Sequence, residues 1–233
     1  MVHKIINNRF RVFVESFLVA GIIFLLGFSL GFFVENHRTA STIENYKLNE
    51  IEMLDLKLQN YYYQIMDGAS CDVAIGQNFI FADKIYEKGL EIEKYEEANM
   101  LSDDIKIEKK RYVLLKTELW LNSILLKEKC GNKFDTLVYF YSNDPSNTIL
   151  VSKQKMFSNV LKEIKENYGN RVILLPIAGD LDLDIVNLQL RLYNVSTFPS
   201  LIINEDILLE GFHSYGEIEA YLSDSDEGVI KLN

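Results

Sequence analysis

The stretch from residue 12 to residue 34 is almost wholly apolar and carries a single charge, at Glu15. No charged residue occurs between Ser16 and Val34. A helix rises about 1.5 Å per residue, so one of this length crosses a bilayer core of about 30 Å. We therefore predict a single-pass transmembrane helix over residues 12–34, with the lipid bilayer as its surroundings.

The charges ahead of this stretch indicate its direction. Lys4, Arg9 and Arg11 precede it, and no acidic residue occurs before Glu15. By the positive-inside rule, residues 1–11 are cytoplasmic and the chain after the helix lies outside, at the cell membrane. The alternative is a cleaved signal peptide. The apolar run is long for such a segment, and Arg38-Thr39-Ala40 makes a poor cleavage site.

Composition limits what the rest of the chain does. The 233 residues carry a formal net charge of -10, which argues against a nucleic-acid partner because such partners need a basic surface. The three prolines, Pro145, Pro176 and Pro199, all lie in the last 90 or so residues. The middle of the chain has none, which suits long uninterrupted helices.

Residues 39–130 have a helical pattern. A coiled-coil-like series recurs at spacings of three and four from Ile51 to Ile65, and Gly68 ends that helix. We expect a second helix over residues 78–100 and a third over residues 103–129, with Ser102 as its N-cap. Short links between them predict an up-down-up helical bundle. The residues of the first series are Ile51, Leu54, Leu58, Tyr61 and Ile65.

Two features of the helices leave alternatives open. Gly27 and Gly31 have the small-xxx-small spacing that lets membrane helices approach, so a homo-oligomer through the transmembrane and helical segments is one interpretation. The other is that glycine is simply common in membrane spans. Residues 61–63, all tyrosine, and Trp120 either line a ligand site or pack between helices, and we favour packing.

The two cysteines, Cys71 and Cys130, follow the ends of the first and third helices. In an up-down-up arrangement these ends lie on the same side of the bundle. Disulfides persist outside the cytoplasm, so we predict a structural Cys71–Cys130 disulfide. The alternatives are two free buried thiols or a redox-active pair, which usually occurs as Cys-x-x-Cys.

The last hundred residues predict alternating strands and helices in the order β-α-β-α-β-β-α. A helix over residues 182–193 has Ile185, Leu188 and Leu192 on one face, and a hairpin turn is expected at residues 204–206. The whole chain is thus α+β: an N-terminal membrane helix, a helical region and a C-terminal α/β domain over residues 134–224. Its expected strands cover residues 137–142, 171–177, 201–203 and 207–212, and its other helices end near Tyr168 and Leu222.

This element order, the strand ending in Tyr-Phe-Tyr-Ser and the loop from Val195 to Pro199 together resemble the thioredoxin family. The resemblance implies a thioredoxin-like fold with a cis peptide bond before Pro199. The family places Cys-x-x-Cys after its first core strand. No cysteine follows Cys130 here, so dithiol exchange cannot reside in this domain.

The resemblance also implies a binding surface. In the family, the backbone beside the cis-proline pairs with an extended peptide, and the turn after the first core strand borders the same groove. The corresponding residues here are Asn143, Asp144, Pro145 and Ser146 with Thr197, Phe198 and Pro199. The alternative is that Pro199 only fixes the fold.

Other chemistry has little support. His3, His37 and His213 are far apart in sequence, so no metal site is expected. Asp180, Asp182 and Asp184 alternate with other residues but lack the pattern of a calcium loop. No cofactor motif occurs. Residues 225–233 are expected to form a flexible tail.

The leading functional interpretation is non-enzymatic. It is a membrane-anchored, extracytoplasmic, redox-inactive thioredoxin-like protein that binds or scaffolds a protein or peptide partner. The alternative is a thiol-disulfide oxidoreductase, or a subunit of a redox complex, that uses Cys71 and Cys130.

Overall fold

The computed structural model describes residues 2–97, 103–144 and 146–222. The chain divides into two compact units, Met1–Leu54 and Asp55–Asn233. The expected tail, the expected N-cap Ser102 and Pro145 lie outside the described residues.

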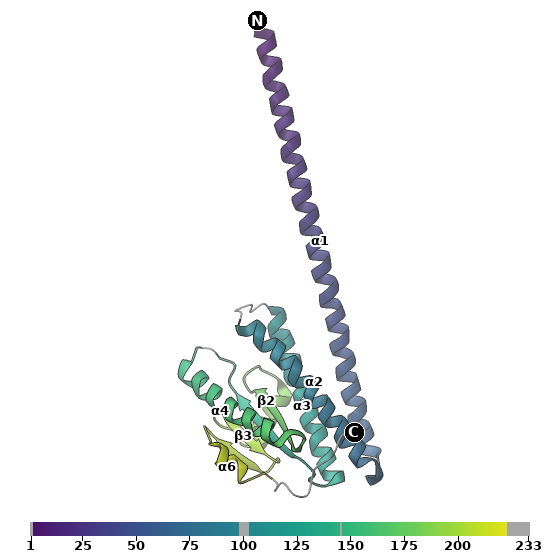
Figure 1. Cartoon of the computed structure of the whole chain (residues 1–233), viewed down its shortest axis with the longest axis vertical. Helices are drawn as coiled ribbons and strands as arrows, with labels where there is room; N and C mark the ends of the chain where they lie inside the picture. Colours follow the sequence, from purple (N-terminus) through teal and green to yellow (C-terminus); the bar gives the residue numbers. More distant parts are fainter. Residues whose placement is uncertain (1, 98–102, 145, 223–233) are drawn as a thin grey trace. The chain divides into compact units, whose positions relative to one another are not determined.

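The first unit is the greater part of one helix, α1 (Val2–Ile65), drawn in purple to blue in Figure 1. Within it, Val12–Gly31 is a 20-residue segment long and apolar enough to cross a membrane, and none of it is buried by the chain itself. It is the one such segment among the residues that the structure describes. This agrees with the predicted span in place and composition.

The second unit begins with the end of α1, the short helix η1 (Gly68–Ser70), α2 (Cys71–Glu97) and α3 (Asp103–Cys130). The second helix was predicted to begin at Asn78, but α2 begins at Cys71, because Gly68 opens a single turn that leads directly into it. Polar pairs join these helices: Asn60 Nδ2 donates to Asn122 Oδ1 at 2.6 Å, and Asn78 Nδ2 donates to Ser123 Oγ at 2.9 Å.

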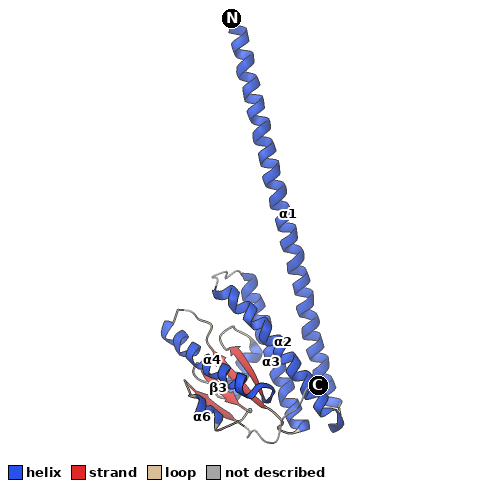
Figure 2. Cartoon of the chain, viewed as in Figure 1, coloured by secondary structure: helices blue, strands red, loops and turns tan. Residues whose placement is uncertain are grey.

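A four-stranded mixed sheet follows in the order β2-β1-β3-β4, shown in red in Figure 2. Strands β1 (Asp135–Tyr141) and β2 (Val172–Ala178) are parallel, and α4 (Thr148–Tyr168) and η2 (Gly169–Arg171) connect them. Helix α5 (Asp184–Leu192) leads to β3 (Ser200–Ile203), which is antiparallel to β1. Strand β4 (Ile207–Glu210) pairs with β3, and α6 (Tyr215–Glu219) follows. The predicted order β-α-β-α-β-β-α is confirmed.

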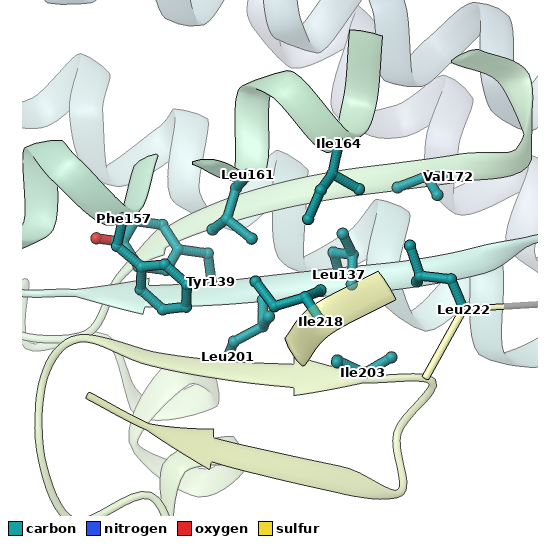
Figure 3. Close-up of a cluster of buried hydrophobic side chains, with 10 residues drawn as sticks. All are labelled: Leu137, Tyr139, Phe157, Leu161, Ile164, Val172, Leu201, Ile203, Ile218 and Leu222. Carbon is teal, nitrogen blue, oxygen red and sulfur yellow. The ribbon is translucent and has the colours of Figure 1, made fainter. Parts of the chain in front are cut away.

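One face of the sheet packs against α4 and α6. Leu137, Tyr139, Leu201 and Ile203 point from the strands toward Phe157, Leu161, Ile164 and Ile218, and all of them are at most 3% exposed (Figure 3). Burying a large apolar side chain contributes about 1.5–3 kcal/mol, so this cluster is a main source of stability for the domain.

The other face packs against α3. Side chains alternate along a strand, so Phe140 points to the face opposite that of Leu137 and Tyr139. Its ring lies 6.1 Å from that of Trp120, centroid to centroid. Trp120 is fully buried and also contacts the ring of Tyr193, so it packs between helix and sheet. Tyr61 and Tyr62 are exposed and Tyr63 is buried, so these aromatic residues do not line one common site.

A buried polar network fixes α3 to the turn between β3 and β4. Lys127 Nζ donates to Thr136 Oγ1 at 2.6 Å and to Glu205 Oε2 at 3.0 Å. Trp120 Nε1 donates to the other oxygen of Glu205 at 2.8 Å. Asn204 and Glu205 have φ of 52° and 61°, a region that residues other than glycine rarely adopt. The network therefore holds Glu205 in an unfavourable backbone conformation.

The apolar face noted for α5, with Ile185, Leu188 and Leu192, is largely open. Leu188 and Leu192 are 50% and 67% exposed. Val186 and Gln189 are buried in their place. Spacing of three and four identifies a helix face, but burial follows a different face of this short helix.

Candidate functional site

The turn between β1 and α4 is organised by side chains that bond to its backbone. Ser142 N donates to Gln154 Oε1 at 2.8 Å, and Gln154 Nε2 donates back to Ser142 O at 3.0 Å. Gln154 lies on α4 and is buried. Asn147 caps the same helix by accepting from Leu150 N at 3.1 Å. The turn is therefore held at both ends by α4.

Asp180, which follows β2, joins the end of β2 to this turn after β1. Its carboxylate accepts from Ser142 Oγ at 2.6 Å and from Asn143 N at 2.7 Å. Gly179 N donates to Tyr141 O at 2.8 Å, which keeps the ends of β1 and β2 together. The sequence shows Asp180 only as part of a calcium-like series; its position two residues after the buried strand β2 is the available signal.

Asp144 and Ser146 close the turn on itself. Ser146 donates from its backbone nitrogen and its hydroxyl to the two oxygens of Asp144, at 2.9 and 2.8 Å. These bonds, the backbone one first, lower the pKa of the Asp144 carboxyl. Asn143 Oδ1 accepts from Lys109 on α3. Three of the predicted site residues, Asn143, Asp144 and Ser146, thus form one ordered polar turn.

The second predicted group lies just before β3. The Phe198–Pro199 peptide bond is cis, as predicted, and Pro199 is buried. The ring of Phe198 rests on Gly179: a Cβ at Gly179 would lie 2.3 Å from Phe198 Cζ. Gly179 therefore leaves the space that the ring occupies. Because Gly179 also bonds to Tyr141, the structure brings Phe198 to the edge of the sheet where β1 and β2 end.

Glu210, at the end of β4, holds the loop ahead of Phe198. One carboxylate oxygen accepts from Ser196 N at 2.9 Å, Ser196 Oγ at 2.8 Å and Thr197 N at 3.2 Å. Hydrogen bonds from Ser196, its backbone nitrogen first, lower the pKa of Glu210. On the other side, Thr197 O accepts from Ser200 Oγ at 2.5 Å. Sequence reasoning missed both Gly179 and Glu210, because their roles depend on contacts between distant segments.

Phe198 differs from its neighbours in its backbone. The amide of Thr197 and the carbonyls of Thr197 and Pro199 all have partners, the last being Gly211 N at 2.8 Å. Within the described part of the chain, neither the N–H nor the carbonyl of Phe198 makes a hydrogen bond. Because backbone groups are nearly always paired when buried, this donor and acceptor are open to water or to another chain.

The predicted disulfide is present and lies elsewhere. Cys71 and Cys130 are bonded, with their Cα atoms 5.6 Å apart. Cys71 is 6% exposed, and beside it Lys133 Nζ forms an ion pair with Asp72 at 2.7 Å. Cys130 precedes the start of β1, whereas the turn at Asn143 follows its end. A strand of seven residues is about 23 Å long. The disulfide and the Phe198 loop therefore lie toward opposite ends of β1.

Comparison with known proteins adds little. No protein-family model matches the chain, and no curated protein matches it. A solved structure described as that of a malarial protein is 18% identical and covers 38% of this chain and 92% of its own, with a TM-score of 0.31. Chloroplastic thioredoxin z is also 18% identical and covers 38% of this chain and 74% of its own, with a TM-score of 0.30. Scores this low carry no argument about function.

Proposed function

We propose that residues 134–224 form a redox-inactive thioredoxin-like domain that binds an extended segment of a partner protein at Phe198. The mode is strand addition, in which backbone hydrogen bonds supply affinity and side-chain contacts supply specificity. The observation that carries the proposal is the unpaired N–H and carbonyl of Phe198, set in a loop whose other backbone groups already have partners.

The surroundings of Phe198 support this mode. The loop is held by Glu210 on one side and by the packing of the Phe198 ring on Gly179 on the other. A pre-organised donor and acceptor bind with less loss of conformational freedom than a loose loop would. The ordered turn at Asn143 and Asp144 lies at the same end of the sheet and borders the bound segment.

An oxidoreductase based on Cys71 and Cys130 is disfavoured. Its cysteines are not beside the proposed peptide surface, and burial of Cys71 at 6% exposure restricts attack on its sulfur.

We further propose that the domain lies outside the cytoplasm, anchored by α1, where this disulfide persists. The rival is tested by equilibrating the full chain in glutathione buffers. A disulfide that stays oxidised at potentials below about -300 mV is structural. A disulfide with a reduction potential near about -200 mV would instead favour the oxidoreductase.

The binding proposal is tested with a displayed library of extended peptides, selected on the full chain in lipid nanodiscs. Selected peptides should slow hydrogen exchange at the Phe198 amide, because that N–H donates to the added strand. Peptides that bind elsewhere and leave exchange at residues 196–198 unchanged would contradict the proposal.

A pair of glycine variants makes this test sharper. Gly179→Ala places a methyl group in the space of the Phe198 ring, 2.3 Å from its Cζ, and should weaken peptide binding about tenfold or more as the ring is displaced. Gly216→Ala is the matched control, since nothing lies within 4 Å of its added Cβ. Equal affinity in both variants would mean that the position of Phe198 does not matter for binding.

A further inference from the structure

The end of α1 has two apolar faces, and the second unit covers one of them. Leu56 and Tyr63 on this face, and Met66 just after the helix, are at most 9% exposed and form part of the core of that unit. Polar contacts add to this face, since Asn122 Nδ2 donates to Leu56 O at 3.5 Å and Lys129 Nζ donates to Gln64 O. This face fixes the end of the helix on its own bundle.

The other face is open to solvent. Its side chains are 53–81% exposed although all are large and apolar. We call it the exposed seam; its members are Ile51 at 61%, Leu54 at 53%, Leu58 at 65%, Tyr61 at 63% and Ile65 at 81%. Single exposed apolar residues are ordinary, but a continuous row of them marks an interaction surface.

The spacing of the seam specifies a coiled coil. Residues 51, 58 and 65 take position a of a heptad, and residues 54 and 61 take position d. Leu56 and Tyr63 then fall at position f, which faces away from the partner in a coiled coil. The residues at position f therefore pack on the bundle of the same chain, whereas those at positions a and d remain exposed for contact with another helix.

We propose that the exposed seam is the interface with a second copy of this chain, as a parallel, in-register two-stranded coiled coil. Identical a and d residues are self-complementary, so a second copy offers a matching row of knobs and holes. The membrane-spanning stretch Val12–Gly31 belongs to the same helix, so two anchored copies point the same way. Short helices are marginal alone, but the disulfide-clipped bundle already holds this one in its helical form.

The flanking charges give the interface a testable signature. In a parallel pair, position g of one helix faces the next position e of the other. Glu50 at g then faces Asp55 of the partner, an unfavourable contact that occurs twice by symmetry. Lys57 at g faces Tyr62 at e, which allows a cation–π contact. Glu50→Lys turns two repulsions into two ion pairs and should tighten the dimer about two- to tenfold.

The interface is tested by disulfide cross-linking of the full chain in membranes, with single cysteines added at seam positions. Leu58→Cys and Tyr61→Cys should give covalent dimers readily. Gln77→Cys, exposed on α2 and away from the seam, is the matched control. Equal cross-linking at all three sites would overturn the proposal, because it would report random collision.

Sedimentation of the full chain in detergent provides the second measurement. The wild-type chain should form dimers, and Glu50→Lys should dimerise at lower concentration. Leu58→Asp should be monomeric and keep a cooperative unfolding transition, since Leu58 is 65% exposed in the single chain. A dimer that survives Leu58→Asp would assign association to the membrane helix and refute the seam. A Glu50→Lys variant no tighter than wild type would refute the parallel register. None of these outcomes depends on peptide binding at Phe198.

Discussion

Replacing Glu205 by alanine should destabilise the second unit by about 3 kcal/mol. Glu205 is the carboxylate partner of Lys127, which is 8% exposed, and the acceptor of the Trp120 N–H. Breaking one side of a buried ion pair costs about 3–5 kcal/mol, and the low end applies because the Glu205 side chain is 16% exposed. Asn204 and Thr136 still accept from Lys127, which also limits the loss.

Two companion variants separate the contributions. Glu205→Gly should be about 1 kcal/mol less harmful than Glu205→Ala, because glycine adopts the φ of 61° at this position without strain. The double variant Lys127→Met with Glu205→Ala should recover part of the loss, since no unpaired charge remains buried.

The assay is guanidinium unfolding of the full chain in detergent, followed by the fluorescence of Trp120, the only tryptophan. Burial lowers the pKa of Lys127, and Glu205 opposes that shift. Without Glu205, the pKa of Lys127 in the folded chain falls further. The unfolded chain then binds the Lys127 proton more tightly than the folded chain does. Stability then rises with pH, and the loss of stability in Glu205→Ala should shrink as the pH rises toward about 10. A deficit under 0.5 kcal/mol, or one that grows with pH, would refute this account of the network.

Two further outcomes follow from buried groups of the helical bundle. Replacing Cys71 and Cys130 together by alanine should cost about 4 kcal/mol, or roughly 8–16 °C in Tm, because the bond closes a loop with a separation of 59 residues. A loss below about 1 kcal/mol in a thermal melt would mean that packing alone keeps the two ends together. Burial raises the pKa of Tyr63 to about 12, so its contribution to stability is complete below pH 10 and is lost as the pH rises toward 12. Tyr63→Phe should therefore lose less stability than wild type in urea unfolding between pH 10 and 11.5, and an identical decline would contradict this assignment.

The sequence predicts the local elements well, because they depend on neighbouring residues. The apolar segment after Arg11, the strand and helix order and the hairpin turn at Asn204 were all expected and are present. The pairing of Cys71 with Cys130 was also predicted, since helix direction alone brings the two helix ends to one side.

The sequence is less informative about which face of an element is covered. Leu188 and Leu192 have the spacing of a core face, yet Gln189 is buried instead. The seam from Ile51 to Ile65 was recognised, but nothing in the local pattern indicated that Leu56 and Tyr63 would pack on the bundle in its place. Whether a face is covered depends on segments far away in the chain.

Long-range polar contacts are the least predictable part of the site. Glu210 bonds to Ser196 and Asp180 to Asn143, across separations of 14 and 37 residues. Acidic residues in loops are usually solvated, so their spacing carries no signal of these partners. Asn143 follows β1, and Thr197 and Phe198 precede β3, whereas the side chains that position them emerge only from the fold.

The disulfide also determines how force would pass through the molecule. A pull applied between α1 and the sheet would travel from Ile65 through η1 to Cys71, across the sulfur atoms to Cys130, and into β1 five residues later. Helices α2 and α3 lie inside the closed loop and outside this covalent path. Tension applied at α1 would therefore reach β1, the strand between β2 and β3, without extending either helix. In the reduced chain, the same pull would also run through both helices.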